Sequence, residues 1–235
     1  MNADEFGMNL ERVRSVIGSA AVKAGRDPLT VKLVPASKKV SPEVLRIAYD
    51  SGLRVFGENR VQEARDKQPL LPANIEWQFI GGLQKNKAKE AVRLFSLIHS
   101  VDSVELAQEI DRRAREAGKV QQVLIEVNVG GESSKHGAAP EQVSPLAGAI
   151  FACNNLELKG FMTVAPFFEE LEKVRPFFRK LREIRDELEQ RSGAKFPELS
   201  MGMSHDYQIA IEEGATIVRV GTALFGARQY PEKTT

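Results

Sequence analysis

The strongest constraint on the fold is a regular alternation of short apolar runs with amphipathic or polar runs. Eight apolar runs predict strands, at residues 31–37, 53–57, 76–81, 95–101, 120–129, 156–164, 198–203 and 216–221. Helical stretches separate these runs, and an amphipathic helix is predicted before the first, at about 4–25. Strict alternation favours parallel strands. Eight such units predict a closed (β/α)8 TIM-type barrel with an extra N-terminal helix; an open doubly wound sheet is the alternative.

Composition narrows the class of protein further. The chain has 235 residues, and 33 Lys and Arg against 32 Asp and Glu give a net charge of +1, which argues against nucleic-acid binding. No linker-like tract divides the chain, so one domain over residues 1–235 is expected. The sequence has no apolar run that could span a membrane and no secretory signal pattern, so we expect a cytoplasmic protein. A lone Cys153 and three histidines without ligand spacing predict no metal site.

Local signals predict where several helices begin. Ser41 followed by proline is a typical helix start. Asp102 with Glu105 resembles a capping box. Pro176 is expected in the first turn of a long charged helix, because an interior proline would break it. Ser204 is expected to cap the helix that follows the seventh strand.

Barrel enzymes and binding proteins place their sites at the carboxyl ends of the strands, often with phosphate on the loops after strands seven and eight. Ser204 and the glycine of Gly221-Thr222 follow these two strands. Helix N-termini offer free N–H donors and the positive end of a dipole, and glycine permits close approach. These loops form a candidate phosphate site, and a purely structural cap is the alternative.

Two basic residues lie at predicted strand ends. An amine at the mouth of an apolar barrel can lose its proton through desolvation and attack a carbonyl. Lys38 fits this role, although Lys39 is adjacent and the position alone does not choose between them. Arg219 shares its side of a strand with Ile217, so it faces the interior if Ile217 does. It would then act at the mouth or form a structural ion pair.

Long segments of the chain resemble a known family. In chain order they are VPASKKVSPE, VFGENRVQEA, WQFIGGLQKNK, EVNVGGESSKHG, LKGFMTVAP and LSMGMSHDYQIAIEEGATIVRVGTALFGAR. Together they resemble the YggS/PROSC family of pyridoxal-phosphate homeostasis proteins, over about residues 9–228. Two departures from the usual motifs are Gln78 in place of a histidine and Arg60 in place of a tyrosine, and no role is assigned to either.

The resemblance implies a barrel like the N-terminal domain of alanine racemases, with pyridoxal 5′-phosphate (PLP) as the cofactor. It implies that Lys38, directly after Ala-Ser, forms the Schiff base. Asn59 of the GEN motif would lie beside the cofactor, and Met203 would pack near the ring. Arg219 would face the pyridine nitrogen. The phosphate would be held by Ser204, Gly221 and Thr222.

The resemblance does not by itself show whether this protein catalyses a reaction on the cofactor. Alanine racemases add a C-terminal β-domain that brings a catalytic tyrosine across a dimer interface, and we expect no such domain here. Two-base racemisation needs a group on each face of the α-carbon. Lys38 offers one, and Tyr207 and Tyr230 are weak candidates for the other.

We therefore predict a non-catalytic, monomeric PLP-binding protein of intracellular vitamin B6 homeostasis. Apo forms of PLP-dependent enzymes are its candidate partners. One alternative is a PLP-dependent amino-acid racemase or lyase that acts with the barrel alone. Another is a barrel whose main role is partner binding through a basic stretch at Lys85, Lys87 and Lys89.

Overall fold

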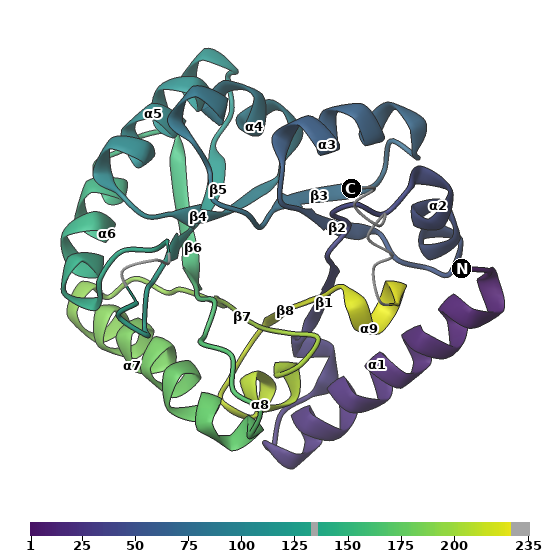
Figure 1. The fold of residues 1–235 in the computed structure, drawn as a ribbon. Helices are drawn as coiled ribbons and strands as arrows, with labels where there is room; N and C mark the ends of the chain where they lie inside the picture. The colour runs from purple at the N-terminus through teal and green to yellow at the C-terminus, as the bar shows by residue number, and fades with distance from the viewer. Residues whose placement is uncertain (133–135, 227–235) are drawn as a thin grey trace, which may run out of the picture.

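Eight parallel strands form the centre of the molecule in a computed structural model that describes residues 1–132 and 136–226 (Figure 1). The strands are β1 (Lys32–Pro35), β2 (Val55–Glu58), β3 (Glu76–Phe79), β4 (Leu97–Val101), β5 (Gln121–Glu126), β6 (Leu156–Met162), β7 (Glu198–Met203) and β8 (Ile217–Val220). Their order is β1-β8-β7-β6-β5-β4-β3-β2. A bridge between Ala36 and Gly57 joins the two ends of this order, so the sheet nearly closes into the predicted barrel.

Helices surround the strands (Figure 1). They are α1 (Ala3–Lys23), α2 (Pro42–Asp50), α3 (Val61–Lys67), α4 (Ala88–Leu94), α5 (Val104–Glu116), α6 (Val143–Phe151), α7 (Arg175–Ser192), α8 (Tyr207–Glu212) and α9 (Thr222–Phe225). The basic stretch at Lys85, Lys87 and Lys89 begins as a 3₁₀ turn, Lys85–Lys87, and continues into α4. Across the described part of the chain, every helix is too short or too polar to traverse a lipid bilayer.

Helix α1 is the extra element outside the eight βα units. Its predicted apolar stripe is buried, from Phe6 through Leu10 and Val13 to Ile17. The stripe packs α1 against α8, α9 and α2, so it covers the junction between the last units of the barrel and the first. The side-chain oxygen of Asn2 caps the helix by accepting from the Glu5 N–H.

The boundary signals were partly wrong. The N-cap of α5 is Ser103, whose hydroxyl accepts from the Leu106 N–H, and not Asp102. The two residues are adjacent and both suit a cap, so only the backbone conformation decides between them. Ser41 is the N-cap residue of α2 but makes no capping hydrogen bond with its side chain. Pro176 lies in the first turn of α7, as predicted.

The barrel interior has two layers that follow from the period of two along each strand. The lower layer is apolar and contains Val34, Leu97, Leu124, Met162 and Ile217. Three polar side chains lie two residues further along the strands of Leu97, Leu124 and Ile217. They are His99, Glu126 and Arg219, and all three are buried. The polar layer therefore lies toward the carboxyl ends of the strands, where a site is expected.

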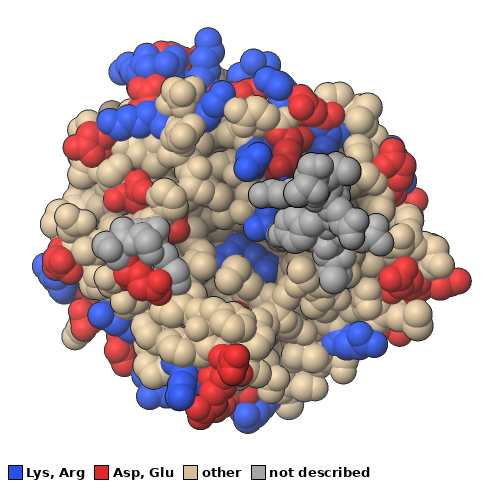
Figure 2. Space-filling view, in the orientation of Figure 1, with Lys and Arg blue, Asp and Glu red and all other residues tan. Residues whose placement is uncertain are grey.

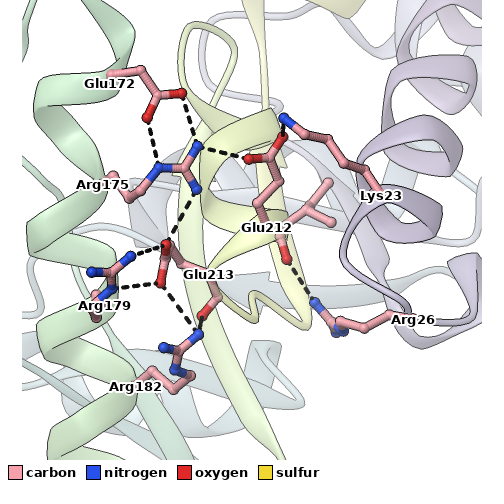
Figure 3. Close-up of polar contacts among 9 residues, drawn as sticks. Lys23, Arg26, Glu172, Arg175, Arg179, Arg182, Glu212 and Glu213 are labelled. Atoms are coloured by element: carbon pink, nitrogen blue, oxygen red, sulfur yellow. Dashed lines mark hydrogen bonds and ion pairs between the residues drawn. The ribbon is translucent and has the colours of Figure 1, made fainter.

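A cluster of ion pairs joins the outer elements α7, α8 and α1 (Figure 3). Arg175, Arg179 and Arg182, spaced to share one face of α7, all reach the carboxylate of Glu213, at distances of 3.2, 3.0 and 3.3 Å. Arg175 also contacts Glu212 at 2.7 Å, and Lys23 of α1 contacts the same carboxylate at 2.8 Å. We call these six residues the outer ion cluster.

Candidate functional site

A hollow with Lys and Arg atoms at its centre is visible on the face shown in Figure 2. Three cavities lie among the loops at the carboxyl ends of the strands. One of about 240 Å³ is lined by Lys38, Gly221 and Thr222. A second of about 320 Å³ is lined by Lys38, Asn59 and Gly82. The third, of about 590 Å³, also reaches Asn59.

Lys38 and Lys39 both line two of these cavities, one toward β8 and the other toward β2 and β3. The side chain of Lys38 is partly buried, whereas Lys39 is exposed. Lys39 has a φ of 60°, the left-handed conformation that non-glycine residues rarely adopt. The turn after β1 therefore gives the two neighbouring lysines different environments.

Asn59 follows β2 and lies very close to the loop after β3. A Cβ atom on Gly81 would stand 2.4 Å from the carbonyl oxygen of Asn59, which is shorter than any ordinary contact. Glycine at position 81 is therefore needed for the backbone of Asn59 to lie this close to the loop after β3. The amide of Asn59 donates to Glu58 Oε2 at 2.9 Å, which fixes the start of the loop.

A buried ion pair lies next to the turn that carries Lys38. Lys67 Nζ is 2.6 Å from Glu58 Oε1, and Glu58 is fully buried. Lys67 Nζ also donates to the carbonyl oxygen of Ser37 at 2.8 Å, and the Ser37 hydroxyl donates to the same Glu58 oxygen at 2.9 Å. Sequence reasoning missed Lys67 and Glu58. The nine-residue separation that brings them together spans a strand end and a helix, which no helical or strand period predicts.

Arg219 lies inside the barrel, as the alternation with Ile217 suggested, and only 4% of its surface is exposed. Its Nη1 donates to the carbonyl oxygen and the hydroxyl of Ser200, at 2.8 and 2.6 Å, and its Nη2 donates to the Thr163 carbonyl at 2.8 Å. These three acceptors are uncharged, so the guanidinium forms no ion pair with them. Burial lowers the pKa of Arg219 to about 10, against the attraction of Glu126 and Asp206, and it remains a cation at neutral pH.

The hydrogen bonds of Arg219 continue across the barrel through neutral groups. Ser200 Oγ is 2.9 Å from His99 Nδ1, and His99 Nε2 is 2.9 Å from Gln78 Oε1. Since Gln78 Oε1 can only accept, the imidazole proton resides on Nε2 and the Ser200 hydroxyl donates to Nδ1. Burial, and then the charge of Arg219, hold the pKa of His99 well below its usual value, so this histidine is neutral. Gln78, to which the sequence assigned no role, orients His99.

Glu126 ends β5 and is 7% exposed. Burial raises the pKa of Glu126 to about 7; Arg219 and His136 oppose this rise and Asp102 adds to it. Within residues 1–132 and 136–226 no side chain donates a hydrogen bond to its carboxyl group. Glu126 is therefore a buried acid poised between its charged and neutral forms. Glu126 was not among the predicted site residues. Its position two residues after Leu124 on the same strand would have indicated that it faces the barrel interior.

Ser204 was expected to cap the helix after β7, and this prediction is wrong. The N-cap of α8 is Asp206, and Ser204 Oγ instead accepts from the amides of Gly221 and Ala223, at 3.1 and 3.3 Å. The reason is geometric: β7 and β8 are neighbours, so the turn after β8 reaches Ser204 before the α8 backbone does. Met203 is the register partner of Arg219 and is 37% exposed.

The structure brings the predicted residues to one end of the barrel in two groups. Gly221, Thr222 and Lys38 line one cavity, and Ser204 joins them through Gly221. Asn59 lines another cavity with Lys38. Of the candidate second acid–base groups, Tyr207 is buried in α8, and Tyr230 lies outside the described residues.

Comparison with known proteins identifies the class. Residues 4–229 match the family described as alanine racemase, N-terminal domain. An alanine racemase from Clostridium difficile 630 is 17% identical and has a TM-score of 0.74 over 98% of this chain and 58% of that chain, which shows a common fold. The chain belongs to the alanine racemase N-terminal domain family.

Nearer relatives define the particular branch. A pyridoxal phosphate homeostasis protein of Aquifex aeolicus is 52% identical over 98% of this chain and 100% of its own. One of Pseudomonas aeruginosa is 42% identical over 94% and 95%. PipY of Synechococcus elongatus PCC7942, solved with PLP bound, is 35% identical, with a TM-score of 0.82 over 94% of this chain and 100% of that chain. Within the larger family, the chain falls among the pyridoxal phosphate homeostasis proteins.

Proposed function

We propose that this protein binds pyridoxal 5′-phosphate at the barrel mouth and holds it covalently through Lys38 in intracellular vitamin B6 homeostasis. The observation that carries the proposal is the position of Lys38 between two cavities, one of which is lined by Gly221 and Thr222. The relatives named above as homeostasis proteins and the PLP-bound PipY support the same ligand. When bound, PLP supplies an aldehyde that condenses with a lysine amine.

The donor set at the mouth fits a phosphorylated pyridine aldehyde. The amides of Gly221 and Ala223 already point at one oxygen, Ser204 Oγ, and a phosphate oxygen can accept from the same donors. Thr222 adds a hydroxyl beside them. Together, Ser204, Gly221 and Thr222 hold the phosphate in this proposal.

The remaining predicted residues would contact the ring. Arg219 presents a buried cation, which favours an unprotonated pyridine nitrogen because a second positive charge beside it is costly. A neutral nitrogen weakens the ring as an electron sink. Met203, paired in register with Arg219, would pack against the ring, and Asn59 would lie at its opposite edge.

Holding rather than turnover is the activity that this site supports best. Racemisation requires acid–base groups on both faces of the substrate α-carbon. Tyr207 is buried in the main hydrophobic cluster and lines neither of the two cavities beside Lys38. We propose a single-domain, monomeric and cytoplasmic carrier, with apo forms of PLP-dependent enzymes as its partners.

The visible absorption spectrum tests the proposal. The native protein mixed with PLP should develop a yellow band that sodium borohydride bleaches, and the Lys38→Ala variant should not. Incubation of the loaded protein with amino acids in deuterated water should give no substantial α-proton exchange. A band that survives in Lys38→Ala would overturn the assignment of the lysine, and Lys38-dependent exchange would favour a racemase acting with the barrel alone.

A further inference from the structure

Two adjacent lysines follow β1, and their amines are chemically equivalent. Lys38 and Lys39 both line the cavity that Asn59 shares and the one that Gly221 shares. Neither cavity by itself therefore determines which amine reacts with an aldehyde. The turn that carries both lysines is the feature that can distinguish the two amines.

The residues on either side of Lys38 are held by one group of side chains. Before it, the Ser37 carbonyl accepts from Lys67 Nζ at 2.8 Å. After it, the Lys39 amide donates to Glu63 Oε2 at 2.8 Å. That same Glu63 oxygen is 3.0 Å from Lys67 Nζ. The ammonium of Lys67 thus links both anchors of the turn.

Burial makes this arrangement rigid. Lys67 is 8% exposed and its partner Glu58 is fully buried, so neither charge can leave the pair without a large desolvation penalty. Ser37 is also fully buried; its hydroxyl donates to Glu58 Oε1 and its amide donates to the Gly57 carbonyl. We call Lys67, Glu58 and Glu63 the turn clamp.

The turn clamp holds Lys39 in a conformation that its side chain disfavours. A φ of 60° is costly for a residue with a Cβ atom, and it persists only where the surroundings enforce it. Two contacts hold this conformation in the structure: the Lys39 amide donates to Glu63, and the Val40 amide donates to the Ser37 carbonyl across the turn. In this conformation Lys39 is exposed, whereas Lys38 is partly buried.

We propose that the turn clamp selects Lys38, rather than Lys39, as the amine that takes the aldehyde. The inference rests on the proposed function, since it names the residues that direct that covalent step. Lys67, Glu58 and Glu63 act as positioning residues: they hold the peptide on both sides of Lys38 and keep Lys39 in its left-handed conformation. Without them the turn relaxes, and either amine can reach the aldehyde.

Borohydride trapping reads out the choice directly. The lysine nitrogen bonds to the aldehyde carbon and water leaves; hydride from borohydride and a proton from solvent then reduce the C=N bond to a stable amine. Native protein with PLP is trapped in this way and digested, and fragment-ion mass spectrometry gives the ratio of modified Lys39 to modified Lys38. This ratio does not depend on how much of the protein is folded, provided that unfolded chains are removed first.

Two variants and one control make the test specific. The double variant Lys67→Met with Glu58→Gln removes both buried charges together, and Glu63→Ala removes the acceptor of the Lys39 amide. The control is Lys119→Met, because Lys119 also donates to two backbone carbonyls, those of Val92 and Phe95, but precedes β5 at the opposite end of the barrel. The ratio should rise by about tenfold in both clamp variants and stay at its native value in the control.

The outcomes separate the two claims. If native protein gives no adduct on either lysine, the proposed function fails. If native protein is modified at Lys38 and both clamp variants keep the native ratio, the function stands and the selection by the turn clamp is overturned. Should the double variant not fold, Glu63→Ala decides alone, because it leaves the buried pair of Lys67 and Glu58 in place.

Discussion

Two regions of this protein hold arginine side chains in different ways. In the outer ion cluster, three arginines of α7 converge on the carboxylate of Glu213 (Figure 3). Inside the barrel, Arg219 is bound by two carbonyl oxygens and a hydroxyl, and no side chain among the described residues donates a hydrogen bond to the carboxyl group of Glu126.

The difference shows what each region is suited to do. In the outer ion cluster, contacts with arginines and Lys23 neutralise the two carboxylates, and these contacts join the helices. The buried cation of Arg219 is held in place by neutral dipoles, so its hydrogen-bonded neighbours do not cancel its charge. Surface ion pairs contribute little individually, but a nearly buried carboxylate with several partners is sensitive to the loss of any charge.

The largest stability effect is expected at Glu213. Burial alone would raise the pKa of Glu213, but hydrogen bonds from Arg179 and Arg175 lower it overall. Glu213→Gln leaves these arginines without their shared anion and should lower the free energy of unfolding by about 4 kcal/mol. Because the folded-state pKa is lowered, the native stabilisation is present above the unfolded pKa and is lost as the pH falls through the folded value. Urea titrations at pH 4 and pH 7 measure both effects, and an equal loss at both would contradict them.

The opposite dependence is expected at Glu126. Its pKa is raised to about 7 in the folded state, so folding is disfavoured progressively as the pH rises from the unfolded value of 4.5 to about 7. Glu126→Gln removes this penalty and should stabilise the protein on the order of 3 kcal/mol at pH 8, with little change at pH 4. Urea titration at the two values is the measurement. A variant that is less stable than native at pH 8 would show that the carboxylate makes a favourable contact there.

A smaller effect, on binding instead of stability, is expected at Arg219. Arg219→Gln keeps donors for the Ser200 and Thr163 carbonyls but removes the charge. The variant should weaken PLP binding by about tenfold, since hydrogen bonds to charged groups contribute about 1.5–3 kcal/mol. Arg179→Gln in the outer ion cluster is the matched control and should leave binding unchanged. Fluorescence titration with PLP measures the affinity of both variants. Equal losses of affinity would contradict the distinction between Arg219 and the outer ion cluster.

The smallest effect concerns His99, where no titration is expected. Its pKa lies well below the usual value because of burial and the charge of Arg219. The ¹⁵N resonances of its ring should therefore stay constant between pH 8 and pH 5.5, with the proton on Nε2. A ring that gains a proton in this range would show that the interior is wetter than the structure indicates.

Local patterns predicted most of the fold, and for a definite reason. Alternating apolar runs depend on near neighbours in the chain, so the eight strands and the stripe of α1 could be read directly. The interior position of Arg219 followed from its spacing to Ile217. Choosing Lys38 over Lys39 needed the resemblance to a family, since both are adjacent at one strand end.

Contacts between distant strands were beyond such patterns. Ser204 binds the turn after β8 rather than its own helix, because β7 and β8 are neighbours in space. The chain from Arg219 through Ser200 and His99 to Gln78 joins residues from β8, β7, β4 and β3. Only closure of the barrel brings these side chains together, so no local sequence pattern predicts their contacts.

The proposed PLP site lies at the barrel mouth, with Lys38, Arg219 and the turn after β8 around the ligand. Diffraction from crystals of the native protein grown with PLP tests this position. We expect density continuous from Lys38 Nζ into the ligand, with the phosphate at the amides of Gly221 and Ala223 and the ring nitrogen toward Arg219. Density joined to another lysine, or a phosphate bound away from Ser204 and Gly221, would contradict it.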